Sequence, residues 1–148
     1  NPSQKLMDAF IFGRSVLKAG QGFTPSNETT NENYFNAAVA DIKLYTEIAL
    51  AAAAYDYLND AIQDVTDADK VHHLSEALAF IFALSFNSEG RLSATQAHLA
   101  LQTMGWDPNN PSLDGVYSIN LWDVTDAQME SAKNILDHAY PGFGAIQF

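Results

Sequence analysis

A run of about thirty residues without glycine or proline, from about residue 33 to residue 64, constrains this fold more than any other feature. Glycine and proline are the residues that most disfavour a helix interior, so their absence predicts one uninterrupted helix here. Mostly apolar residues at heptad-like spacing predict the inner face of this helix: Ala38, Asp41, Tyr45, Ile48, Ala52 and Tyr55. Asp41 is the one charged member of that series, which makes it a candidate for a buried polar or ligand-binding residue.

Four further segments carry helical signals. They cover about residues 3–19, 66–86, 93–105 and 125–140. Thr66 and Asp67 are both residue types that cap helices. Ser93 with Gln96, and Thr125 with Gln128, have the spacing of a capping box, in which two side chains satisfy the first backbone amides. We expect the helix-borne phenylalanines to lie in the core: Phe10, Phe12, Phe80, Phe82 and Phe86. The predicted fold class is all-α, an up-and-down bundle of four to five helices.

Two stretches lack a helical period. Residues 20–33 are rich in Gly, Ser, Thr and Asn, which predicts a solvated loop. Residues 106–124 contain several turn signals, and so long a connection is typical of a functional or core-covering segment. We expect one long ordered loop there, crossing the bundle in an extended conformation. Trp106 and Trp122, near its two ends, would hold it down by burying their rings.

Composition and charge limit the function classes. The chain has 148 residues, enough for one domain with a sizeable core, and we expect a single helical-bundle domain over residues 1–148. A net charge of -11 repels phosphates, which excludes nucleic acid as a partner. The absence of cysteine excludes disulfide and thiolate chemistry. No apolar stretch is long enough for a transmembrane segment, and the N-terminus lacks the plan of a signal peptide, as expected of a mature or trimmed exported form.

The sequence HHLSE, residues 72–76, places two imidazoles and a carboxylate in the first turns of an otherwise apolar helix. Successive helical residues are rotated by about 100°, so Glu76 falls angularly between His72 and His73. Imidazole nitrogen and carboxylate oxygen suit a transition metal ion such as iron or zinc. We expect only one of the two histidines to face the same interior as Glu76, and a metal site needs at least three protein ligands. Candidates on the long helix are Asp41, Glu47 and Asp56.

Two other interpretations of the same residues stay open. A histidine and a glutamate three or four residues apart on a helix surface form an ordinary side-chain pair. If they are buried, they form a polar network that orients two helices. For Asp41, burial with a hydrogen-bond partner is the simplest interpretation. No G-x-S-x-G, H-E-x-x-H or phosphate-binding glycine loop occurs, so the sequence indicates no catalytic centre.

Three stretches carry a resemblance to known families: HHLSEALAFIFALSFN, FGRSVLKAG and NLWDVTDAQMESAKNIL. They look like an uncharacterised bacterial helical family, the domain of unknown function four-eight-five-six. The H-x-x-E element also resembles the imelysin families of exported bacterial proteins, which are associated with iron uptake and were once described as peptidases. The resemblance implies a helical bundle that is repeated in pairs, of which this chain would be one half or a fragment. It also implies that His73 and Glu76 are the functional pair.

The resemblance further implies an exported protein, periplasmic or at the cell surface of a Gram-negative bacterium. We therefore expect a non-catalytic domain that binds a metal ion or a small metal-bearing ligand at His73 and Glu76, with His72 and Asp41 as lesser candidates. The alternative is a protein-interaction or structural module in which the H-x-x-E element is a buried polar network. A third option, a metal-dependent peptidase, lacks the expected ligand and general-base spacing.

Overall fold

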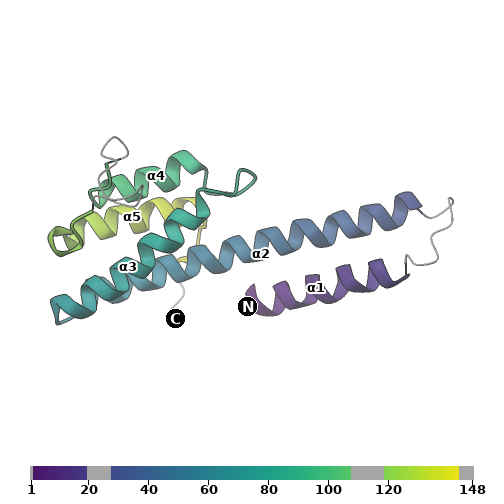
Figure 1. Cartoon of the computed structure of the whole chain (residues 1–148), viewed down its shortest axis with the longest axis horizontal. Helices are drawn as coiled ribbons and strands as arrows, with labels where there is room; N and C mark the ends of the chain where they lie inside the picture. Colours follow the sequence, from purple (N-terminus) through teal and green to yellow (C-terminus); the bar gives the residue numbers. More distant parts are fainter. Residues whose placement is uncertain (1, 20–27, 108–118, 144–148) are drawn as a thin grey trace. The chain divides into compact units, whose positions relative to one another are not determined.

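The computed structural model describes residues 2–19, 28–107 and 119–143. Within this part of the chain lie five α-helices and one short 3-10 helix, and no strand. They are α1 (Pro2–Ala19), α2 (Glu28–Gln63), α3 (Asp67–Leu84), α4 (Ala94–Thr103), η2 (Leu121–Asp123) and α5 (Asp126–Ala139), as Figure 1 shows. The predicted all-α helical bundle is confirmed. None of the described helices is both long and apolar enough to cross a membrane.

The long helix predicted from the missing glycines and prolines is confirmed, and at 36 residues it is longer than expected. It begins at Glu28, so residues 28–33 are helical and the prediction of a loop there was wrong. The threonines and asparagines of residues 28–33 are poor helix formers, which is why they indicated a loop. The rest of that predicted loop, residues 20–27, lies outside the described residues.

The capping signals of the other helices are confirmed. Thr66 accepts a hydrogen bond from the Asp69 amide at 3.2 Å and begins α3. A complete capping box begins α4, where the Ser93 amide donates to the Gln96 side chain at 3.0 Å. A second box of the same kind, between Thr125 and Gln128, begins α5. These local bonds fix where three helices start, independently of what the helices pack against.

The described residues form two compact units, residues 1–49 and residues 50–148, and the boundary falls inside α2. The single domain over residues 1–148 stays a prediction. In the first unit α1 packs along the N-terminal part of α2 through small side chains. A Cβ added to Gly13 would lie 3.2 Å from the Ala38 Cβ, and Ala9 and Val16 are buried beside it. Small residues therefore let these two helices approach closely.

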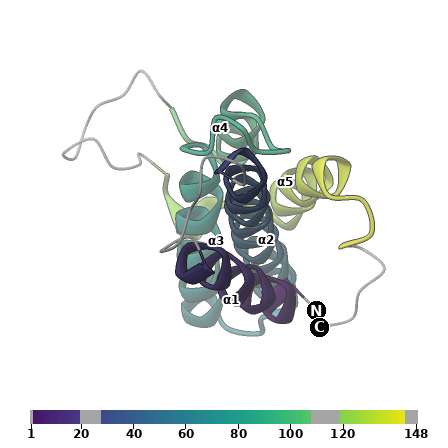
Figure 2. The same ribbon diagram turned by 90° about the vertical axis from the view of Figure 1, so that its right-hand side faces the viewer.

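The second unit contains the aliphatic core. Seen along α2 in Figure 2, α3 and α5 lie on either side of the C-terminal part of α2, and α4 packs against both α3 and α5. The largest fully buried side chains all belong to this unit: Leu58, Leu74, Ile81, Leu84, Leu92, Leu101, Met104, Met129 and Leu136. Alanines such as Ala54, Ala100 and Ala132 are also fully buried and let the helices pack closely.

An aromatic group closes the C-terminal end of the second unit. The Phe143 ring stacks on Tyr140 with a centroid distance of 5.3 Å and meets the edge of Tyr55 at 5.8 Å. Lys133 is buried on α5, where its Nζ lies 5.2 Å from the centroid of the Tyr55 ring and 3.0 Å from a Glu130 oxygen. A buried ammonium group is tolerated here because a ring face and a carboxylate surround it.

Several burial predictions were wrong. Trp122 is 63% exposed on η2, so it does not anchor the long connection by burial, although η2 itself packs against α3. Trp106 is half-buried, with its ring centroid 5.0 Å from that of His98. Phe10, Phe12 and Phe86 are exposed although we predicted them in the core. Residues 108–118, most of the predicted ordered loop, lie outside the described residues.

Candidate functional site

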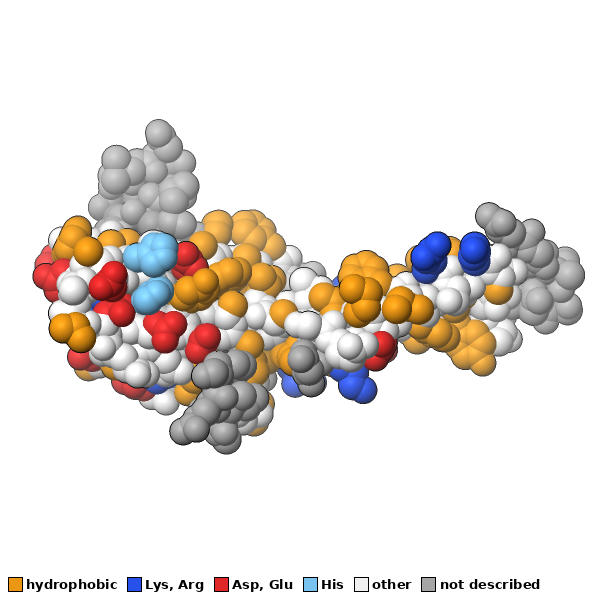
Figure 3. Space-filling view, turned by 90° about the horizontal axis from the view of Figure 1, so that it is seen from below, with side chains coloured by type: hydrophobic (Ala, Val, Ile, Leu, Met, Phe, Trp, Pro, Cys, Tyr) orange, Lys and Arg blue, Asp and Glu red, His pale blue; other side chains and the backbone are white. Residues whose placement is uncertain are grey.

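The candidate site lies where α2 turns back into α3. Residues 64–66 connect the two helices, and this short turn brings the first turns of α3 alongside the last turns of α2. We call the polar residues at this turn the hairpin cluster. Its members are Asp56, Tyr57, Asp60, Asp64, His72, His73 and Glu76. Figure 3 shows histidine side chains surrounded by acidic ones on the surface of this unit.

His73 pairs with Asp64. The His73 Nδ1 atom lies 2.8 Å from the Asp64 Oδ2 atom, and the two side chains are only 27% and 16% exposed. An ionised carboxylate can only accept, so the Nδ1–H group of His73 donates this hydrogen bond to Asp64. The hydrogen bond that His73 donates to Asp64 raises the pKa of His73, and the negative charges of Asp64, Asp60 and Glu76 act in the same direction against the opposing effect of burial.

Glu76 has different partners. Its Oε1 atom lies 3.4 Å from the Nε2 atom of His72, one helical turn earlier, and His72 is well exposed. The Tyr57 hydroxyl of α2 donates a hydrogen bond to Glu76, which raises the tyrosine pKa together with the charge of that carboxylate. The Tyr57 ring stacks on Phe80 of α3 at 5.8 Å. Glu76 of α3 therefore has one partner on its own helix, His72, and one on α2, Tyr57.

Carboxylates of α2 complete the hairpin cluster. Asp56 and Asp60 are one helical turn apart on α2, and Asp64 follows four residues later, directly after the helix ends. Burial, and then the charge of Asp60, raise the pKa of Asp56. Four carboxylates thus share one side of the hairpin with two imidazoles whose ring centroids are 5.3 Å apart. The combined field favours cations.

The structure changes the predicted pairing. His72 contacts Glu76 but is exposed, so it shares no interior with that carboxylate, and His73, which the resemblance implies, contacts Asp64 instead. Asp41 belongs to the first unit and is exposed, so it is not the buried polar residue that its position in the inner-face series of the long helix predicted. No group of three or more histidine, aspartate and glutamate side chains among the described residues is arranged to hold a metal ion.

Sequence reasoning missed Asp64 and Tyr57. Asp64 lies nine residues before His73, on the other side of a predicted break between two helices. A tight turn between two antiparallel helices brings such residues together, and this was the available signal. Tyr57 is on the same face of α2 as Asp60 and Asp64, because these residues are three or four positions apart. Both contacts depend on how α2 and α3 are packed, and neither is a property of the H-x-x-E element alone.

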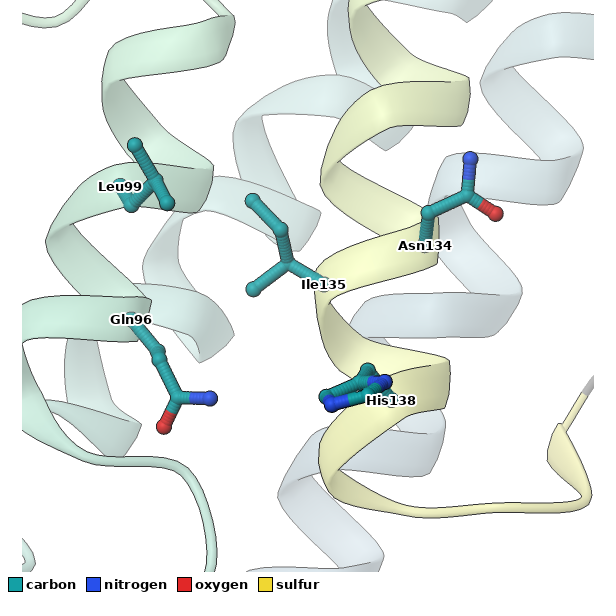
Figure 4. Close-up of a pocket in the computed structure, with 5 residues that line it drawn as sticks. All are labelled: Gln96, Leu99, Asn134, Ile135 and His138. Atoms are coloured by element: carbon teal, nitrogen blue, oxygen red, sulfur yellow. The ribbon is translucent and has the colours of Figure 1, made fainter.

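A separate pocket of about 300 Å³ lies between α4 and α5. Leu99 and Ile135 face each other across it, and Gln96 and His138 lie beside them, as Figure 4 shows. The residues that line this pocket belong to α4 and α5, whereas the hairpin cluster lies on α2, α3 and the turn between them. No carboxylate is among the lining residues, so the His138 imidazole has none beside it within the pocket lining. The pocket is mainly apolar and offers no group of side chains that could act together as ligands or catalysts.

Comparison with known proteins gives no match: no family model, no curated protein and no solved structure is similar to this chain. The resemblance to the domain of unknown function four-eight-five-six and to imelysins therefore stays a prediction. What can be said of function depends on the geometry of the hairpin cluster.

The first test of this geometry is the titration of His73. We expect an imidazole pKa above the ordinary value of about 6.5, and a fall toward that value in Asp64→Asn. Because the folded-state pKa is raised, the stabilising contribution of the pair is fully present below the unfolded-state pKa and is lost as the pH rises through the folded-state pKa. NMR titration of the imidazole, together with urea unfolding across this pH window, measures both effects.

Asp67→Asn is the matched control for that titration. Asp67 is exposed in the first turn of α3, and its charge is not among the causes of the His73 shift. The Asp67→Asn substitution removes one negative charge from the same hairpin and leaves the 2.8 Å contact between His73 and Asp64 in place. Equal falls of the His73 pKa in both variants would mean that general acidity, and not the Asp64 contact, is responsible.

Proposed function

We propose that this chain is a non-catalytic bacterial domain, exported to the periplasm or the cell surface, that binds a metal ion or a small metal-bearing ligand at the hairpin cluster. One observation carries the proposal: the Nδ1 atom of His73 lies 2.8 Å from the Oδ2 atom of Asp64, where its N–H group donates a hydrogen bond to the carboxylate. Metal-binding histidines commonly donate one ring N–H to a carboxylate, which fixes the tautomer and leaves the other nitrogen as the ligand atom. In this arrangement Nε2 of His73 is the metal ligand and Asp64 orients it.

His72 and Glu76 are the residues that would complete the ligand set. The His72 ring is close to that of His73, and because His72 is exposed it can change rotamer at little cost. Glu76 would exchange its contact with His72 for a shared metal ion. Iron or zinc fits two imidazoles and one carboxylate. The link to iron uptake and the export of the protein are supported by the family resemblance alone.

The experiment is metal analysis of untagged protein followed by calorimetric titration with Zn²⁺. We expect one equivalent of metal to bind to the wild-type chain and none to His73→Ala with Glu76→Ala. Asp64→Ala should weaken Zn²⁺ binding about 10–100-fold without removing a ligand, as expected of a carboxylate that only orients the histidine. His138→Ala, on α5, is the control for a general loss of surface imidazole. Equal metal content in the wild type and the double variant would reject the site.

A second candidate function has its own support. The contacts of His73 with Asp64 and of Tyr57 with Glu76 both connect the α2 side of the hairpin to α3. A polar network of this kind orients two helices and suits a structural or protein-interaction module. If His73→Ala with Glu76→Ala lowers the thermal midpoint while the wild type binds no metal, this interpretation replaces the first.

A further inference from the structure

The outer face of α1 is apolar although its inner face is made of small residues. Met7, Phe10, Ile11 and Leu17 each expose more than half of their surface. The buried residues of α1 are Ala9, Gly13 and Val16. A helix normally turns its large apolar side chains inward, so this arrangement leaves the better hydrophobic face of α1 on the outside of the first unit.

The exposed residues are ordered along the helix. Met7, Phe10, Arg14 and Leu17 follow one another at spacings of three, four and three residues, the pattern of a seam that packs against a second helix. On a helical projection this seam is about 110° away from the small-residue seam that faces α2. The spacing is the same when it is read in the reverse direction, so two copies of the seam match when they run antiparallel.

The side chains also match in that direction. Antiparallel pairing places Met7 opposite Leu17 of the second copy and Phe10 opposite Arg14. The guanidinium of each Arg14 would then lie over a phenylalanine ring, a favourable cation–π contact. A parallel pairing would instead place the two Arg14 side chains against each other. The residue chemistry thus selects one orientation.

Charge favours the first unit as the meeting point of two copies. Residues 1–49 contain four basic and five acidic residues, a net charge of -1. Residues 50–148 contain three basic and thirteen acidic residues, a net charge of -10. Two copies therefore repel each other strongly through their second units and hardly at all through their first. A membrane with anionic lipids would repel the same chain, whose total net charge is -11.

The available area is that of a small interface. The four large side chains, Met7, Phe10, Ile11 and Leu17, each expose about half of a surface of roughly 200 Å². Together they present about 400 Å² of apolar surface per copy. The stems of Arg14 and Lys18 add to this and bring the area near the lower end of specific interfaces, about 600 Å² per partner. We propose that the outer face of α1 is a homodimer interface, in which the Met7, Phe10, Arg14 and Leu17 seams of two copies pair antiparallel about a two-fold axis.

Sedimentation equilibrium of the 148-residue chain at tens of micromolar tests this proposal. We expect a mass twice the 16.2 kDa of one chain. Phe10→Asp with Leu17→Asp should weaken the dimer at least tenfold and give the mass of one chain, with unchanged helicity by circular dichroism because both side chains are already exposed. The control is Phe86→Asp with Trp122→Asp, two exposed aromatics of the second unit, which should leave the dimer intact. A wild-type chain with the mass of one copy would overturn the proposal.

Cross-linking tests the orientation. The chain has no cysteine, so engineered thiols are the only ones present. We expect a disulfide-linked product when Met7→Cys and Leu17→Cys chains are mixed and oxidised, and little product from either variant alone. A Met7–Met7 cross-link would overturn the antiparallel arrangement. If the chain is monomeric and the amides of α1 are protected in hydrogen exchange, or if it binds neutral lipid vesicles, the face has another occupant and the dimer is rejected.

Discussion

Ala132→Asp should unfold the second unit or come close to doing so. Ala132 is fully buried on α5, the helix against which α4 packs. An aspartate at this position would bring a carboxylate without a partner into the core, which costs roughly 4 kcal/mol or more. The total stability of a domain of this size is about 5–15 kcal/mol, so we expect a large fall in the thermal midpoint or a loss of soluble folded protein. Circular dichroism during heating measures this.

Ala127→Asp is the matched control for this substitution. Ala127 is exposed in the first turn of the same helix, where a carboxylate lies near the positive end of the helix dipole. Its midpoint should stay close to that of the wild type, within about 0.5 kcal/mol of stability. Ala132→Ser, which brings a hydroxyl in place of a charge, should lie between the two. Similar midpoints for the two aspartate variants would contradict the packing of α5 described above.

Leu101→Ala should cost about 2–5 kcal/mol of unfolding free energy. Leu101 is fully buried on α4, and its truncation removes apolar contacts and leaves a cavity that the surrounding helices fill only in part. Leu99→Ala provides the comparison, because this leucine is two residues away on the same helix but 49% exposed. Its truncation should cost less than about 1 kcal/mol. Urea denaturation of the two variants measures the difference, and equal midpoints would show that α4 is not buried in the way the structure has it.

Local sequence signals predicted the helices well. Ser93 and Thr125 were assigned as the starts of helices from residue type and spacing alone, and Thr66 was one of two candidate caps beside Asp67. Each of the three accepts a capping hydrogen bond. The length of α2 followed from an interval without glycine or proline. Capping and propensity act over three or four residues, so the sequence carries them in full.

Burial was predicted less well. The phenylalanines at positions 10 and 86 are hydrophobic enough for a core, yet both are exposed. Phe10 was predicted in the core for its size, whereas the packed face of α1 is the one with Gly13, where α2 comes close. Hydrophobicity alone does not say which of two faces meets a neighbour, because close helix packing also rewards small side chains.

The candidate site shows the same division. The sequence placed the two imidazoles and the carboxylate of residues 72–76 close together, because a helix fixes the relative directions of side chains one turn apart. It could not identify Asp64 as the partner of His73, since that contact joins two helices across a turn. Nor could the sequence show that the partners of Glu76 are His72 and Tyr57 of α2, and not His73.

By itself, the sequence determined that this chain is all-α, where most of its helices begin, and which polar residues lie within one turn of each other. These follow from backbone hydrogen bonding and side-chain spacing within a single helix. Only the tertiary structure decided which helix faces are buried and that His73 pairs with Asp64. It also decided that the large apolar side chains of α1 lie outside. Such contacts join residues from different helices, and their energies depend on how those helices pack.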